Sequence, residues 1–490
     1  MRELTPQTRP RGWFARTMPV TRSLLLWRGW LYLAYIGVAL LLVVGIVNAA
    51  GTYSSSDDLK VELERLRLQG APLSCAQAAP PAIPADQNAA PLYLKVAAQI
   101  EPHQPKGAGY ADGRVGAGDW KPGQPMRYGV ADWWNPEAMK ALSDLVKSDE
   151  ESLQLLYQAA ARPGCRFDLK WSDGFAMMMP HLAKMRAICR FCVDATAVAV
   201  VEGNSELAGR RLKAAVAMAC HATQEPSLIS QLVAYAITNM AERTAEFALS
   251  KGSLSEADAR AILAKITDLK LSNGMIRALQ TERAMVLDIY DMARRDPASA
   301  SALIGSSEGA EKITEWMWWL YVKGFPSLIN ADELAYLEFT DWSVRAAALP
   351  WAECRSEYQK MEEWTKEHFA RALIARSVGP ATYRVAQRRF ETEVLLNLIS
   401  GSLGLALYKQ KTGQFPESLD ALARINWPVP QDPFTDGPMK YTLQGDRYLL
   451  YSVGKDGVDD GGKPVWRMAS HPPGPPPADQ DLGDMPWQWR

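Results

Sequence analysis

Three aspartates in a glycine-rich loop are the residues of this chain best suited to hold a hard cation. The loop closes the stretch "YLLYSVGKDGVDDGG" at 448–462 and contains Asp456, Asp459 and Asp460. Carboxylates and loop carbonyls supply the oxygen ligands that Ca²⁺ prefers, and glycines let the backbone wrap around an ion. The spacing is not that of an EF-hand. The alternative is a solvated turn, since Asp and Gly are common turn residues. The loop is therefore a candidate calcium site that would pin a hairpin rather than perform chemistry.

Two cysteines are spaced for redox or metal chemistry in the sequence "CRFC", at Cys189 and Cys192. Such a pair is reactive when it opens a helix whose dipole stabilises the thiolate. Here the helical pattern already begins near Pro180, and His181 and Met185 fall on the same face as both cysteines. A soft Cu(I) site or a disulfide to another cysteine are the alternatives. Because a stripe of Ala, Met and Cys is typical of a helix core, we predict that both thiols pack there.

Two groups of tryptophans are candidates for contacts with a partner. Trp133 and Trp134 lie in a Gly- and Pro-rich stretch, which predicts a surface loop and a partner-binding role. Three more, in "EWMWWLYV" at 315–322, follow a helical pattern that favours the helical core or a contact with the next helix.

Familiar catalytic motifs do not occur in the sequence. It has no Gly-x-Ser-x-Gly, no His-Glu-x-x-His and no P-loop. The glycine-rich stretch at 107–118 lacks the strand–turn–helix context of a dinucleotide site. The net charge of −1 provides no field that would attract nucleic acid. We therefore expect a non-enzymatic protein that binds no nucleic acid, with an enzyme that lacks a recognisable motif as the alternative.

A membrane span is predicted at 29–47, where "GWLYLAYIGVALLLVVGIV" has no charge in 19 residues. As a helix it would be roughly 28 Å long, close to the hydrocarbon thickness of a bilayer. Arginines dominate 1–28, whereas serines and aspartates follow the run. The positive-inside rule then places 1–28 in the cytoplasm and the bulk of the chain outside it. A cleaved signal peptide is the alternative, although the run exceeds the usual h-region. No later stretch is comparably long and charge-free, so we predict a single-pass protein.

The remaining pattern predicts a mainly α-helical protein. Segments rich in Ala, Leu and Met alternate with short breaks and form helical hairpins similar to tetratricopeptide units. Near the end, "MKYTL", "QGD" and "RYLLYSV" predict a β-hairpin. The predicted regions are a juxtamembrane helix with a Pro/Gly-rich link at 48–135, an α-helical domain at 136–380, a small α+β region at 381–462 and a disordered Pro-rich tail at 463–490.

A series of motifs follows Leu405: "ALYKQKTGQFPESLDAL", "DPFTDGPMKY" and the aspartate loop. This series resembles the C-terminal region of the major pseudopilins of type II secretion. The resemblance implies a long helix, a Gly-x-Phe-Pro turn, a short helix, an Asp-Pro-Phe turn and an aromatic strand. It also implies calcium in the matching loop, as some pseudopilins have. The pseudopilin leader and its Phe/Met-Thr-Leu-x-Glu helix do not precede Gly29, so a fibre subunit is not expected.

The whole plan, with Asn-Ala-Ala-Pro-x-Tyr at 88–93, is similar to a family of large, uncharacterised single-pass proteins of planctomycete-like bacteria. That resemblance implies a place in the bacterial plasma (inner) membrane and no particular activity. We therefore expect an extracytoplasmic scaffold or interaction protein whose partner is another envelope protein. An accessory component of a type II secretion or pilus-like machine is the alternative.

Overall fold

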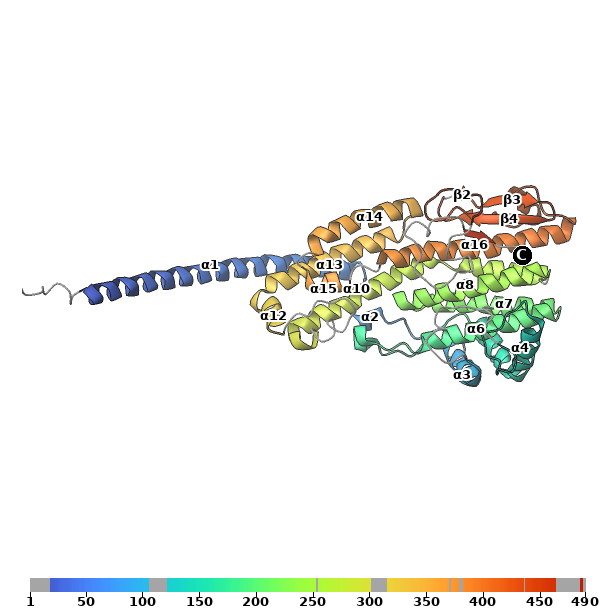
Figure 1. The fold of residues 1–490 in the computed structure, drawn as a ribbon, viewed down its shortest axis with the longest axis horizontal. Helices are drawn as coiled ribbons and strands as arrows, with labels where there is room; N and C mark the ends of the chain where they lie inside the picture. The colour runs from blue at the N-terminus through green and yellow to red at the C-terminus, as the bar shows by residue number, and fades with distance from the viewer. Residues whose placement is uncertain are drawn as a thin grey trace, which may run out of the picture.

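The computed structural model describes residues 18–104, 121–252, 254–300, 315–369, 372–378, 382–435, 437–463 and 485–487. These residues are mainly helical, with a small amount of β-structure near the C-terminus. A long N-terminal helix projects from an elongated body of packed helices, and a small sheet lies on one side of that body (Figure 1). The predicted fold class, mainly α with a C-terminal hairpin, is confirmed at this level.

The N-terminal helix α1 runs from Met18 to Leu68 without a break. The sequence pattern predicts a membrane span followed by a separate juxtamembrane helix, but the structure merges them: no proline separates the two, and Gly51 lies inside the continuous α1. The large apolar side chains between Trp30 and Val47 are exposed to the surroundings of the protein. The apolar part of α1 is therefore not part of the body.

A second helix, α16 at Thr382–Thr412, is also long and apolar enough to cross a membrane by composition alone. α16 meets this criterion by length and mean hydropathy, although it is not as long and charge-free as 29–47. In α16, however, 78% of the apolar window is buried inside the body, against 0% for α1. The apolarity of α16 is explained by its position in the core.

The first half of the body consists of helices joined by short breaks at the places that the sequence predicts. Asn204 shows how one break forms: Gly203 takes a φ of 72°, and the Asn204 side chain then accepts a hydrogen bond from Leu207 N at 3.1 Å to start the next helix. The helices are α2 (Cys75–Ala78), α3 (Ala90–Ile100), α4 (Pro136–Ser148), α5 (Glu150–Ala161), α6 (His181–Val201), α7 (Ser205–Ala222), α8 (Leu228–Ser250), α9 (Glu256–Asp268) and α10 (Leu271–Arg295), with the 3₁₀ turns η2 (Glu101–His103) and η4 (Trp171–Ala176).

The second half lies closer to α1. The helix α13 packs along α1, and α16 packs against α8 in the core. The elements are α12 (Glu315–Trp319), the π-helical turn η5 (Leu320–Gly324), α13 (Pro326–Ala346), α14 (Trp351–His368), α15 (Leu373–Val378), α16 and the 3₁₀ helix η7 (Leu419–Ile425). The tetratricopeptide-like arrangement of the hairpins stays a prediction.

The predicted hairpin is present as β3 (Lys440–Gln444) and β4 (Arg447–Ser452), which pair antiparallel around a turn at Gly445. The two-residue strands β1 (Gln431–Asp432) and β2 (Gly437–Pro438) pair separately. Part of the tail differs from the prediction of disorder: β5 (Met485–Trp487) pairs with β4. The Trp487 side chain is fully buried, so apolar burial fixes these three residues.

Asp432 explains the Asp-Pro-Phe turn in physical terms. Its buried carboxylate accepts hydrogen bonds from Ser452 Oγ at 2.8 Å, from Phe434 N at 3.0 Å and from Val453 N at 3.0 Å. One side chain thus closes its own turn and holds the end of β4. The turn and the hairpin are therefore a single unit packed on α16.

Candidate functional site

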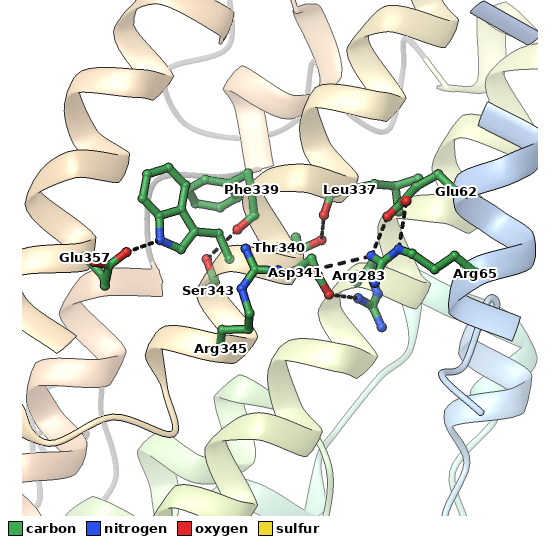
Figure 2. Close-up of polar contacts among 11 residues, drawn as sticks. Glu62, Arg65, Arg283, Leu337, Phe339, Thr340, Asp341, Ser343, Arg345 and Glu357 are labelled. Carbon is green, nitrogen blue, oxygen red and sulfur yellow. Dashed lines mark hydrogen bonds and ion pairs between the residues drawn. The ribbon is translucent and has the colours of Figure 1, made fainter. Parts of the chain in front are cut away.

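The junction between α1 and the body contains a layer of charged residues at its centre (Figure 2). Arg65 of α1 forms two hydrogen bonds with Glu62, at 2.6 and 2.9 Å, and its guanidinium lies 3.4 Å from Asp341 of α13. Asp341 also pairs with Arg345 on its own helix and lies 3.8 Å from Arg283 of α10. One carboxylate therefore faces three guanidinium groups from three helices.

The charged layer rests on an apolar contact between the same three helices. Leu59 and Leu66 of α1 pack with Leu287 of α10 and Leu337 of α13, and all four are buried. The spacing of Leu59 and Leu66 places both on one face of α1. This spacing can be read from the sequence, but the sequence does not show that α10 and α13 cover the stripe.

Burial and ion pairing shift the pKa values of the junction. The hydrogen bonds from Arg65 hold the pKa of Glu62 below its usual value, and those bonds in turn raise the pKa of Arg65. Burial lowers the pKa of Arg283, which is only 2% exposed, and Asp341 opposes that shift. Asp341 is therefore the counter-charge that makes a buried guanidinium tolerable at this position.

Replacing Asp341 by Asn should lower the free energy of unfolding by roughly 1–2 kcal/mol, because Arg283 loses its counter-charge while remaining buried. Thermal unfolding of the full chain in detergent, followed by circular dichroism, measures the change. The matched control is Arg345→Gln, since the Arg345 side chain is 66% exposed and should contribute under about 0.5 kcal/mol. Equal effects of the two substitutions would show that Arg283 does not depend on Asp341.

Hydrogen bonds continue the junction toward the apolar part of α1. Asn330 of α13 donates to Ser55 Oγ at 3.2 Å and to Ser56 Oγ at 3.0 Å. Further along, Asn48 Nδ2 donates to the carbonyl of Gly324 at 2.7 Å. These bonds hold α1 against the body from Leu66 back to the first polar residue after the apolar run.

Asp332 of α13 is buried and joins four elements. Its buried carboxylate accepts from Tyr290 Oη of α10 at 2.7 Å and from Tyr321 Oη of η5 at 2.6 Å. It also accepts from Ile374 N at 2.9 Å and Ala375 N at 3.0 Å, in the first turn of α15. Burial and the nearby carboxylate raise the pKa of both tyrosines, so the hydroxyls stay protonated donors. This side chain fixes the position of η5 relative to α10, α13 and α15.

The three loop aspartates predicted to hold calcium are exposed or partly exposed and make local contacts. Asp459 accepts from Tyr451 Oη at 2.9 Å and from Gly461 N at 3.1 Å, and it lies 3.4 Å from Lys440 Nζ. The hydrogen bond from Tyr451 is the largest cause of its lowered pKa. Asp456 accepts from Val458 N at 3.2 Å. In the part of the chain that the structure describes, no three His, Cys, Asp or Glu side chains are placed to hold a metal ion. Calcium at Asp456, Asp459 and Asp460 stays a prediction, and the lysine beside Asp459 argues against it.

The cysteine pair lies inside α6 rather than at its start. Cys189 and Cys192 are fully buried free thiols, and burial raises the pKa of Cys192 to about 12. Thiols with raised pKa values are poor nucleophiles and poor metal ligands. The prediction that both residues fill core is confirmed by their burial. His181 is bonded elsewhere, 3.0 Å from Glu225, and stacks on Phe167.

The two tryptophans predicted to bind a partner occupy different environments. Trp133 is buried, and its indole donates to Asp194 Oδ1 at 2.8 Å, so its predicted surface position is wrong. Gly129 N donates to the other oxygen of Asp194, and burial raises the pKa of that carboxyl to about 7. Trp134 is 51% exposed. Only Trp134 is available to a partner.

A pocket with a volume of about 370 Å³ opens close to Trp134, between α8, α9 and α16. Lys251 connects the two, because it lines the pocket and its ammonium lies 4.9 Å from the centre of the Trp134 ring. The lining is largely apolar, with Leu249, Leu254, Leu403, Leu407 and Phe415, and it also contains Lys251, Lys409 and Glu256. Such a pocket suits an apolar side chain of a partner.

The histidines do not gather into a catalytic group in the described residues. His103 pairs with Asp149 at 2.7 Å, His181 pairs with Glu225, and His221 Nδ1 lies 2.7 Å from Tyr93 Oη. Burial lowers the pKa of His221 to about 4, so this ring is neutral and structural. Each of these three histidines is used in a separate contact that ties different segments together.

Sequence reasoning missed Asp332, Asp341 and Asp194. A signal was present for Asp194, which lies in an otherwise apolar helical segment, because a buried carboxylate requires partners. Asp332 and Asp341 share α13 with other polar and charged residues, so the sequence does not set them apart. Comparisons of the chain with protein-family models, with curated proteins and with solved structures find no match. Function is therefore inferred from the geometry of the junction and the pocket.

Proposed function

We propose that the protein is a membrane-anchored scaffold or interaction protein of the bacterial cell envelope, with its body outside the cytoplasm. The observation that carries the proposal is α1. Its apolar side chains are exposed for the whole predicted span, while the same helix continues into a junction fixed by buried leucines and ion pairs. Exposed apolar surface of this length suits a lipid environment.

An uncleaved anchor is favoured over a signal peptide by the same helix. Asn48 and Gly51 lie inside the unbroken α1, where Asn48 bonds to Gly324 and Gly51 lies close to Ser327. A cut after Ala49 would remove Asn48 with its hydrogen bond to Gly324 and would interrupt α1 two residues before Gly51. The junction thus uses residues that a signal peptide would not need.

A protease added to intact spheroplasts should digest the chain beyond Val47 and leave a fragment that retains the apolar span. This follows from the positive-inside rule, because arginines precede the span and acids follow it. Immunoblotting with antibodies against the body measures the digestion, and a cytoplasmic protein serves as the lysis control. Protection of the body would reverse the proposed orientation.

Binding of another envelope protein is assigned to the surface formed by Trp134 and the pocket beside Lys251. An exposed aromatic ring next to an apolar pocket is the usual composition of a binding hot spot. The helical hairpins, in a tetratricopeptide-like arrangement, would present this surface. Cross-linking in native membranes from a residue at the pocket rim would identify the partner.

An accessory role in a type II secretion or pilus-like machine is the second candidate. The order of elements after Thr382 favours it: a long helix, a turn at Gly413, the short helix η7, the Asp432 turn and a hairpin. This order is what the resemblance to pseudopilins implies. Co-purification with pseudopilins would support this candidate, and failure to co-purify would leave the general scaffold.

A further inference from the structure

We propose that the exposed aromatic face of α12 and η5 sits in the headgroup layer of the bilayer beside α1, as a second membrane contact of this chain. The inference rests on the proposed anchor and goes beyond it, because it places the body in a fixed orientation against the membrane. We define this aromatic face by Trp316, Trp319, Leu320 and Lys323.

The aromatic face has an unusual distribution of side chains for the surface of a body. Trp316 is 65% and Trp319 is 58% exposed, and Leu320 is exposed beside them. On the opposite side Trp318 and Tyr321 are buried. The spacing of 316, 319, 320 and 323 follows one side of a helix, where a water-facing helix carries polar residues. Met317 and Leu328 extend the patch, so these are not isolated exposed side chains.

The position of this face relative to α1 identifies what covers it. Asn48 is the first polar residue after the apolar run, and its amide donates to the carbonyl of Gly324, the last residue of η5, at 2.7 Å. Gly324 is therefore level with the end of the span. Trp316 is eight positions earlier, which is within about 12 Å along a helix. Figure 1 shows α12 at the end of the body from which α1 projects.

The residue types match the chemistry of a membrane surface. Tryptophan is enriched where the acyl chains meet the headgroups, because its ring is apolar and its indole N–H finds polar partners there. Lys323, at the edge of the face, is exposed; its ammonium donates to the carbonyl of Arg294 and has further hydrogens for lipid phosphates. Tyr53 of α1 is 74% exposed just beyond Asn48 and adds to the same belt. An aromatic belt from two separate elements would fix both the tilt and the rotation of the body.

Single cysteines carrying a nitroxide label test the proposal in the full chain, reconstituted in lipid nanodiscs. The three positions are Trp319→Cys on the aromatic face, Leu40→Cys in the span and Val201→Cys at the end of α6, each exposed in the structure. Spin relaxation of the label by oxygen indicates that the label lies in lipid, whereas relaxation by a water-soluble nickel chelate indicates that it is in contact with water. The labelled wild type corrects for native thiols, of which five are buried.

We expect the ratio of relaxation by oxygen to relaxation by nickel to be severalfold higher for the label at Trp319 than for the label at Val201. The ratio at Leu40 should be higher still. A lipid-like ratio at Leu40 with a Val201-like ratio at Trp319 would overturn this inference and leave the anchor intact. A water-like ratio at Leu40 would overturn the anchor and the inference together. Leu328→Cys repeats the measurement if the first variant fails to fold, as judged by circular dichroism.

Discussion

Replacing Asp332 by Ala should destabilise the protein by at least about 4 kcal/mol, the largest loss expected from a single substitution in the described residues. The substitution leaves four donors without an acceptor: the hydroxyls of Tyr290 and Tyr321 and two backbone N–H groups at the start of α15. A buried donor without a partner costs about 1–3 kcal/mol. The midpoint of thermal unfolding of the full chain in detergent should therefore fall by many degrees.

Two variants make the Asp332 result specific. Asp332→Asn keeps the size and one oxygen acceptor, so it should lose roughly half as much stability as the alanine variant. Asp144→Ala removes an exposed carboxylate from α4 and should change stability by no more than about 0.5 kcal/mol. If Asp332→Ala were as stable as Asp144→Ala, the proposed role of Asp332 in joining four elements would be wrong.

Local patterns account for the parts of the fold that the sequence predicts well. The break between α6 and α7 follows from Gly203 and Asn204, and α16 ends where Gly413 takes a φ of 89°. The hairpin follows from aromatic strands around Gly445. In each case the conformation is decided by residues within one or two turns, so periodicity and turn residues are sufficient.

Long-range contacts account for the parts that the sequence predicts poorly. The docking of α1 on the body depends on α10 and α13, which cover Leu59 and Leu66 more than 200 residues later in the chain. The strand β5 forms because Trp487 is buried beside β4, and the proline-rich tail before it gives no periodic signal. Neither contact can be predicted from a short window of the sequence, because the two partners lie in different parts of the chain.

The predicted surface position of Trp133 is wrong for a related reason. Trp133 and Trp134 are adjacent in sequence and share the same local composition, yet one is buried and the other exposed. The difference comes from Asp194, whose buried carboxylate takes the Trp133 indole as a donor. An aspartate in the apolar stretch "FCVDATAVAVV" requires such a donor, but one sequence does not say which segment supplies it.

Buried carboxyls without a full set of donors should make the protein less stable as the pH rises. Burial raises the pKa of Glu242 to about 8 from 4.5, and of Glu282 and Glu333 to about 7. Between those values and their ordinary pKa, the folded state binds more protons than the unfolded state. Their contribution is therefore fully present below about pH 4 and is lost as the pH rises through 7 to 8.

Glu242 should dominate this dependence, so Glu242→Gln should be more stable than the wild type at pH 8.5 by roughly 4–5 kcal/mol and nearly equal to it at pH 4. Burial is the largest cause of the raised pKa of Glu242, Glu246 adds like charge one turn away, and Arg243 opposes both. Unfolding midpoints measured from pH 4 to 9 test the sign. The control is Glu362→Gln, whose side chain is 73% exposed and which should follow the wild-type curve. A variant curve parallel to that of the wild type would mean that folding does not raise the pKa of Glu242.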